Sequence, residues 1–322
     1  MRPKQFNVYL AFCFGLLVGV YVMRRPPSSS QPLFSKRDGF EKRTAFHNVS
    51  TSQVASYWNA QPCNSRWRFD GVEFGTRMHW DKVMQRKYTV EPHIPVFADF
   101  DAWSGKRVLE IGGGMCTTAI SFAKAGAHMT IVDLSEESMA LCRKRFAIYN
   151  LTADIHVGDA QRLLSWLEGA VEAFDLVWSF GVIHHMPHPE QAVAQAYRAL
   201  KPGGTFKIMM YTKISMKLFW VMHNTQTWEF GDIAMDQLIA HYSEAVEGSP
   251  VTYTYTMYEL RQLLHQFTIK IMFKAHIFKY DIDKYKQNIL QVDAAYRDVT
   301  PSRFAQLEEE LGWHLCATAI KE

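Results

Sequence analysis

The sequence predicts a doubly wound α/β domain with a seven-stranded sheet, mostly parallel and completed by an antiparallel edge hairpin. Between residues 106 and 212, β-rich runs alternate with segments of helical apolar spacing, as in a parallel sheet covered by helices on both faces. Glycines follow the first β-rich run, and an acidic residue ends or follows each of the next two. The composition, 48% hydrophobic and 21% charged, excludes disordered, collagen-like and multi-span membrane proteins.

The first 45 residues are expected to form a membrane anchor followed by a Pro/Ser-rich linker. Residues 6–23 contain Asn7 as their only strongly polar residue, and a helix here would be about 27 Å long, near the roughly 30 Å of a bilayer core. Basic residues flank the run on both sides, so the orientation of the anchor stays open. A cleaved signal peptide is the main alternative, but the following RRPPSSS is a poor cleavage context.

The basic net charge belongs to the N-terminal tail rather than to the rest of the chain. The formal charge is +3 at pH 7, and residues 1–37 hold six of the 35 basic residues and no acidic one. The remainder therefore has 29 basic residues against 32 acidic ones, without a clustered basic stripe. A nucleic-acid partner would need such clusters to neutralise phosphates, so none is expected.

Cysteines and a glycosylation sequon point to different compartments for the body of the protein. The five cysteines are odd in number and widely spaced, and they are expected to be reduced thiols, which favours a cytosolic body. The triplet Asn48-Val49-Ser50 is a sequon that would suit a lumenal body. We predict a single-pass membrane protein and prefer the cytosolic side for its body.

The body is expected to have a helical cap over 46–105, a core over 106–212 and a C-terminal part over 213–322. In the core, Gly126 is a suitable stop for the first helix, and Ser135 caps the second, whose first turn holds Glu136 and Glu137. The predicted strands cover 106–111, 128–133, 154–157, 174–180 and 205–211, and the predicted helices cover 117–125, 135–149, 160–167 and 190–200.

The alternation of strands and helices ends after residue 211. Residues 213–230 are rich in aromatic residues and Met, and the stretch from Trp220 to Trp228 is either a lid over an acceptor site or core packing of an inserted helix. Further helices are expected near 234–241 and over 257–267, and strands over 269–278 and 313–320. The two late strands would form the antiparallel hairpin.

The strongest chemical signal lies where the core strands end. Glu110 is followed by Gly112 and Gly114, and glycines there let a ligand approach the backbone and the next helix N-terminus closely. Asp133 ends the second strand 19 residues after Gly114, where a carboxylate could accept both hydroxyls of a ribose. Asp159 follows the third strand and is placed for an adenine amino group.

The run VLEIGGG…VDLS…GDA…FDLVWSFGVIHH…LKPGG resembles class I S-adenosylmethionine-dependent methyltransferases of the ubiquinone-type (methyltransferase type 11) superfamily, over roughly residues 88–212. The resemblance implies a Rossmann-like fold, S-adenosylmethionine as methyl-donor cosubstrate, and no metal. Cys116 stands where the family has its third glycine. The resemblance implies that the methionine part of the cosubstrate is bound by Glu110, Gly112 and Gly114, and the ribose by Asp133. It further implies that the adenine contacts Asp159 and Ala160, and that the pocket wall includes Ser179 and Phe180.

Two histidines after the fourth strand are candidate general bases. His184 and His185 follow the strand at the edge where the methyl group is expected, and histidine suits proton removal from an oxygen or nitrogen nucleophile near neutral pH. Alternatively, both are pocket-wall and capping residues. In the cap, Tyr88 is a candidate to close over the cofactor.

Two other enzyme classes fit the motifs less well. A dinucleotide dehydrogenase would need a glycine where Thr117 stands, and nucleic-acid amino methyltransferases need N/D-P-P-Y/W where this chain has SFGV. The sequence therefore predicts a membrane-anchored methyltransferase that acts on oxygen or nitrogen of a small or lipophilic acceptor. The alternatives are a secretory-pathway enzyme acting on a glycan or peptide, and a non-catalytic membrane-tethered binding module.

Overall fold

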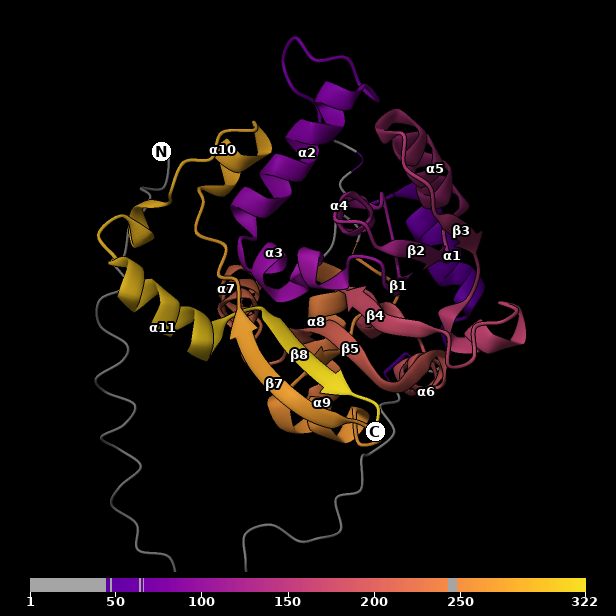
Figure 1. The fold of residues 1–322 in the computed structure, drawn as a ribbon. Coiled ribbons are helices and arrows are strands. Elements are labelled where there is room, and N and C mark those ends of the chain that lie inside the picture. Colours follow the sequence, from indigo (N-terminus) through magenta and orange to yellow (C-terminus); the bar gives the residue numbers. More distant parts are fainter. Residues whose placement is uncertain (1–44, 47, 64, 66, 243–247) are drawn as a thin grey trace, which may run out of the picture. The chain divides into compact units, whose positions relative to one another are not determined.

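One mixed β-sheet organises the residues that the computed structural model describes, namely 45–46, 48–63, 65, 67–242 and 248–322. Its strands lie in the order β3-β2-β1-β4-β5-β8-β7, and the short β6 pairs with β5 (Figure 1). The pairs among β1 to β5 are parallel, whereas β8 is antiparallel to both β5 and β7. The strands are β1 (Arg107–Ile111), β2 (His128–Asp133), β3 (Asp154–Val157), β4 (Phe174–Phe180), β5 (Leu200–Thr212), β6 (Thr254–Tyr255), β7 (Thr268–Ala275) and β8 (His314–Ile320).

Helices cover both faces of the sheet, because apolar side chains of its strands point to both faces and need to be buried. Leu109 and Ile111 of β1 pack in a cluster with α6 and α9, and Val108, just before them, packs in a second cluster with α2 to α5. The helices are α1 (Thr51–Ala60), α2 (Arg77–Val90), α3 (His93–Ala98), α4 (Thr117–Lys124), α5 (Glu136–Tyr149), α6 (Pro189–Ala199), α7 (Met216–Thr225), α8 (Asp232–Tyr242), α9 (Met257–Leu263), α10 (Ile282–Lys286) and α11 (Pro301–Leu311).

The predicted α/β fold and its antiparallel edge hairpin are confirmed, with local differences. β6 adds an eighth strand to the seven expected. Ala160–Ser165 is a 3₁₀ helix rather than an α-helix, and the backbone of Arg162 is non-helical there (φ −125°, ψ 22°). Sequence analysis did not predict α11, whose residues all stay at least partly exposed.

The predicted membrane span over 6–23 and nearly all of the linker lie outside the described residues. Among the residues that the structure does describe, no helix is both long enough and apolar enough to cross a bilayer.

Cys116 and Cys142 form a disulfide, which corrects the expectation of reduced thiols at these two positions. Cys116 precedes α4 in a left-handed conformation (φ 59°), and Cys142 lies on the buried face of α5. Their Cα atoms are 5.3 Å apart, within the usual range for a disulfide. Their sequence separation of 26 conceals the pairing, because only the packing of α5 beside the β1–α4 loop brings the two together.

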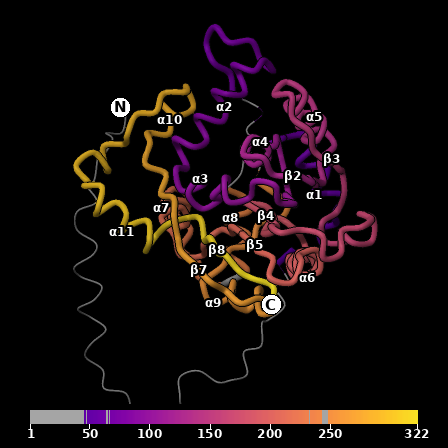
Figure 2. The backbone as a smooth tube through the Cα atoms, in the orientation of Figure 1, coloured from indigo at the N-terminus to yellow at the C-terminus, as the bar shows by residue number. Residues whose placement is uncertain are grey.

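The connection between β7 and β8 joins the C-terminal part to the cap. Figure 2 shows the chain leaving β7, passing through α10 and α11, and returning in β8. From α2, Arg86 donates to the carbonyl oxygen of Tyr285 at 3.0 Å, and its guanidinium lies 3.9 Å from the ring centre of Trp67 and 4.2 Å from that of Tyr285. This contact holds α10 against α2, next to the edge hairpin.

Candidate active site

A cavity opens at the carboxyl ends of β1, β2 and β4, the edge at which open α/β sheets bind ligands. The glycine loop after β1, the turn at 158–161 and the cap helices α1 and α2 surround it. The sequence-predicted residues that line it are Glu110, Gly112, Gly114, Asp133, Asp159, Ala160, Phe180 and His185. The structure thus brings together residues that are up to 75 positions apart (110 to 185) in the chain.

The loop between β1 and α4 lies against this cavity because two glycines adopt left-handed backbone conformations. The φ angle is 80° at Gly112 and 49° at Gly114. A Cβ atom at Gly112 would clash with Val182, which also lines the cavity, whereas a Cβ atom at Gly114 would enter open space. Gly112 is therefore required for packing, and Gly114 leaves room for a ligand.

Asp133, at the end of β2, holds the glycine loop in place. Its Oδ2 accepts a hydrogen bond from the backbone N–H of Gly114 and its Oδ1 one from that of Ser135, both at 2.8 Å. Burial raises the pKa of Asp133, and the backbone N–H donors oppose that shift. Carboxylate oxygens have further lone pairs, so Asp133 can order the loop and still accept hydroxyl hydrogen bonds from a ribose.

Glu110 is a buried acid on the cavity wall, with 3% of its surface exposed. Its Oε1 accepts a hydrogen bond from the Thr118 hydroxyl on α4, and its Oε2 has no partner among the described residues. Burial raises the pKa of Glu110 to about 8. An ammonium group in the cavity would give Oε2 a partner and favour the ionised carboxylate, so Glu110 fits the amino end of S-adenosylmethionine.

The turn after β3 gives the cavity a second polar edge. Asp159 Oδ1 accepts from the backbone N–H of Gln161 at 2.9 Å and from its side-chain Nε2 at 3.0 Å. The Gln161 Oε1 in turn accepts from the backbone N–H of His188 at 2.9 Å. Together with the buried Ala160, this edge offers a carboxylate beside a small apolar surface, which suits an adenine ring and its amino group.

Three predicted site residues lie outside the lining of the cavity. Tyr88 makes a hydrogen bond between its hydroxyl and that of Ser121 at 2.7 Å, so it supports α4 from the cap. Ser179 is fully buried on β4, where side chains alternate between the two faces of the strand and Phe180 takes the cavity side. His184 is also fully buried, with its ring centre 3.9 Å from that of Tyr211. For these three residues, a contact with the donor stays a prediction.

His184 and His185 differ strongly in their surroundings. Burial lowers the pKa of His184 well below its usual range, and neither of its ring nitrogens has a partner in the described part of the chain. His185 lines the cavity, and its Nδ1 lies 2.8 Å from the carbonyl oxygen of Val251. A carbonyl oxygen only accepts, so Nδ1 carries the proton and the lone pair of the neutral ring is on Nε2. His185 is therefore the candidate proton acceptor.

Sequence analysis missed Trp58, Lys87 and Tyr211 as lining residues. Lys87 immediately precedes Tyr88, and consecutive residues of a helix point about 100° apart. The tyrosine was predicted at the cavity, but α2 turns the lysine toward it instead. A one-residue error of this kind cannot be avoided without knowing how α2 packs.

The stretch from Trp220 to Trp228 does not line the cavity. On α7, Leu218, Val221 and Met222 are buried against α8 and Trp313, as expected for core packing of an inserted helix. The two tryptophans themselves point outward, with 46% and 53% of their surfaces exposed.

Comparisons with known proteins agree with this cavity. Residues 108–204 match the model of a family described as "methyltransferase domain". The ubiquinone biosynthesis O-methyltransferase of Aromatoleum aromaticum is 35% identical over 128 residues, which are 39% of this chain and 53% of that protein. A ubiquinone/menaquinone biosynthesis C-methyltransferase of Bartonella bacilliformis is 30% identical over 149 residues, 45% of this chain and 55% of that protein. The chain thus spans about half the length of these relatives.

Two solved structures share the fold. Magnesium protoporphyrin IX methyltransferase from Synechocystis PCC 6803, solved with bound SAH, has a TM-score of 0.53 at 13% identity and covers 85% of this chain and 100% of that one. The cyclase SpnF has a TM-score of 0.51 at 17% identity and covers 84% of this chain and 96% of that one. At such low identity the likeness concerns the fold alone. Motif and family match together show that residues 108–204 belong to the class I S-adenosylmethionine-dependent methyltransferase superfamily.

Proposed function

We propose that this protein transfers a methyl group from S-adenosylmethionine to an oxygen or nitrogen of a small or lipophilic acceptor at a membrane. One observation carries the proposal: a single cavity joins the glycine loop and its acids to His185 and an aromatic wall. The two relatives named for quinone biosynthesis support a small-molecule acceptor.

The chain's own residues would bind and orient the donor, which supplies a methyl group already activated on sulfur. Lys87 is the lining's lone Lys or Arg side chain within the described residues, and we expect its ammonium to pair with the donor carboxylate. Burial is the largest influence and lowers the pKa of Lys87, but Glu91, 3.3 Å away, together with Cys63 and Tyr88 raises that pKa overall. Glu110 and Asp133 would hold the amino group and the ribose.

The acceptor would lie between His185 and an apolar wall that includes Trp58, Met186 and Tyr211. The Trp58 ring meets His185 edge-on at 5.3 Å between ring centres, and Tyr211 does so at 5.5 Å. Such walls exclude water and favour an apolar or ring-bearing acceptor. His185 would remove a proton from the acceptor nucleophile through Nε2.

A membrane location is supported by the predicted span over 6–23 and by exposed apolar residues on the α7–α8 segment. Trp220 and Trp228 are 46% and 53% exposed, and Phe230 and Ile233 are 62% and 51% exposed. Tryptophan and other large apolar side chains are favoured at membrane–water interfaces. We propose that this segment faces the bilayer from which a lipophilic acceptor enters.

A second candidate function is methylation of a glycan or peptide in the secretory pathway. The Cys116–Cys142 disulfide favours it, because disulfides persist in oxidising compartments and are rare in the cytosol. Asn48 of the sequon is exposed, as glycosylation requires.

The test is incubation of the full-length protein with isotopically labelled S-adenosylmethionine and cell extract, followed by mass spectrometry of the labelled products. We expect label in a lipid or small-molecule fraction. Label in a glycan or peptide would support the second candidate. Failure of the protein to bind S-adenosylmethionine in isothermal titration would contradict both.

The role of His185 is tested with His185→Gln and, as a matched control, His265→Gln at an exposed histidine. Loss of a general base lowers rates about 10²- to 10⁴-fold. We expect a loss in this range for His185→Gln, with donor affinity unchanged, and none for the control. Equal activity of the two variants would exclude His185 as the base.

A further inference from the structure

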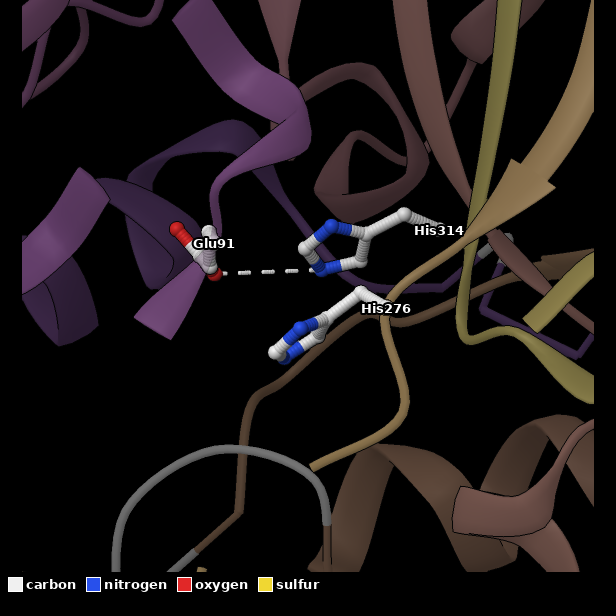
Figure 3. A group of neighbouring side chains, drawn as sticks. All are labelled: Glu91, His276 and His314. Carbon is white, nitrogen blue, oxygen red and sulfur yellow. Dashed lines mark ion pairs between the residues drawn. The ribbon is translucent and has the colours of Figure 1, made fainter. Parts of the chain in front are cut away.

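A second group of polar side chains lies where the cap meets the edge hairpin. Glu91 follows α2, His276 follows β7, and His314 begins β8. Each offers one ligand atom, and these atoms all lie within 4.8 Å of one another. Figure 3 shows the carboxylate of Glu91 facing the His314 ring, with the His276 ring alongside. We propose that Glu91, His276 and His314 bind a divalent transition-metal ion of the zinc type.

The geometry needs only small side-chain movements to hold such an ion. The Oε1 of Glu91 lies 4.0 Å from Nε2 of His314, and the ring centres of His276 and His314 are 4.6 Å apart. A tetrahedral ion with bonds of about 2.0–2.1 Å holds its ligand atoms roughly 3.4 Å apart. The ligand atoms, which lie within 4.8 Å of one another, would have to approach by up to about 1.4 Å.

In metal sites, the ligating side chains are usually held by hydrogen bonds to other residues. Two of the three proposed ligands already have such contacts. The Nδ1 of His314 lies 3.0 Å from Nε2 of His93, and a hydrogen bond from Nδ1 leaves the lone pair of His314 on Nε2, toward Glu91. Lys87 pairs with Oε2 of Glu91 at 3.3 Å, whereas Oε1 faces His314. The ion would therefore bind without displacing either contact.

The charges of these residues also suit a cation. Burial lowers the pKa of His93 to about 4, and it also lowers the pKa values of His276 and His314 below their usual range. For Glu91, burial is the largest influence and raises the pKa, but the neighbouring charges of Lys87, His276 and His93 and the hydrogen bond to Lys87 together lower it. Neutral imidazoles and an ionised carboxylate are the forms that bind metal.

Glu91 also borders a cavity of its own. This residue lines a second, smaller cavity together with Trp67, Arg86, Lys87 and Tyr285. Two histidines and a glutamate leave a fourth position open, as in catalytic rather than structural zinc sites. Phe180 lies between this site and the donor cavity, because it lines the cavity and its ring centre is 5.4 Å from that of His314. The ion would join the cap to the edge hairpin beside the acceptor.

The test is metal binding by the full-length, tag-free protein, with methyl transfer left out of the measurement. Zn²⁺ titration should show one site, and Co²⁺ should give the visible absorption of a tetrahedral site. We expect Glu91→Gln and His276→Gln to weaken Zn²⁺ binding at least tenfold and to abolish the Co²⁺ spectrum. His93→Asn should weaken it about 10- to 100-fold, as loss of an outer partner does.

The control is His265→Gln, which removes an exposed histidine and should leave the affinity unchanged. Glu91 is partly exposed, so Glu91→Gln is expected to fold, and binding of S-adenosylhomocysteine verifies this for every variant. Unchanged Zn²⁺ affinity in Glu91→Gln and His276→Gln would overturn the proposal. Thiolate charge-transfer bands with Co²⁺ would also overturn it, because they would assign the ion to cysteine.

Discussion

At the scale of single residues, the number of donors around each buried acid decides its protonation. Asp133 and Glu110 both line the cavity, and burial raises the pKa of each. Asp133 accepts from two backbone N–H groups of the folded loop. Glu110 has one hydroxyl donor and an oxygen without a partner in the described residues, and its pKa rises to about 8. The two acids therefore respond differently to pH and to a ligand.

Replacing Asp133 tests the donor site directly. Asp133→Ala removes the acceptor for the ribose hydroxyls and for the N–H of Gly114, and hydrogen bonds to charged groups are worth about 1.5–3 kcal/mol. We expect binding of S-adenosylhomocysteine to weaken about 10- to 100-fold in isothermal titration. The exposed acid Asp154 on β3 is the matched control. Unchanged affinity in Asp133→Ala would contradict the assignment.

Glu110 gives the protein a predictable pH dependence. Its folded pKa of about 8 lies above the usual glutamate pKa of 4.5, so the folded state binds more protons between these two values. This stabilisation is complete below pH 4.5 and is lost as the pH rises through 8. In Glu110→Gln, urea unfolding should lose this slope, which is at most about 1.4 kcal/mol per pH unit. Parallel pH profiles of the two proteins would exclude a proton on Glu110.

At the scale of elements, the β1–α4 loop is held from three sides. Val182 packs against Gly112, Asp133 bonds the N–H of Gly114, and the disulfide ties Cys116 to α5. A loop restrained in this way needs little ordering when a ligand binds, which benefits affinity.

The contact between Gly112 and Val182 is tested by comparing two glycines. Gly112 and Gly71 have similar positive φ angles of 80° and 68°, but a Cβ atom at Gly71 would meet nothing within 4 Å. Both substitutions therefore strain the backbone, and Gly112→Ala in addition causes a clash with Val182. We expect Gly112→Ala to lower the urea midpoint more and to weaken donor binding. Equal effects of the two variants would show that the Val182 side chain moves aside without a cost in stability.

The disulfide should contribute about 3 kcal/mol of stability, because it closes a loop of 26 residues. Cys142→Ser, or a reductant, is expected to lower the free energy of urea unfolding by this amount. Cys63→Ser, at a cysteine outside the disulfide, is the control. If reductant and Cys142→Ser both leave the unfolding curve unchanged, the two thiols are not bonded in the purified protein.

At the scale of the whole molecule, two features of the chain concern its compartment. The basic tail contains the predicted anchor, and the body contains a disulfide and an exposed sequon asparagine. The disulfide weighs against the cytosolic body that the cysteine pattern predicted.

Protease protection in sealed microsomes tests the topology of the full-length protein. A lumenal body would be protected, and Asn48→Gln would abolish a mobility shift due to glycosylation. This is the result we expect from the disulfide. Digestion of the body without detergent, with no shift for wild type, would place it in the cytosol.

The sequence alone determined the fold class and many of the residues that line the cavity, because both depend on local signals. The spacing of apolar residues along the chain distinguishes strands from helices. Four of the predicted site residues lie at or just after a strand end, namely Gly112, Gly114, Asp133 and Asp159. The carboxyl ends of parallel strands meet at one edge of the sheet, so their order along the chain was enough to bring them together.

The tertiary structure decided every feature that depends on which side of an element faces a neighbour. It placed Lys87 at the cavity and the side chain of Tyr88 against α4. It also put His185 on the cavity wall and His184 in the core, and it joined Cys116 to Cys142. The Glu91–His276–His314 group draws on segments up to 223 positions apart (91 to 314). No spacing in the sequence shows such a group, because only packing of the cap against the hairpin creates it.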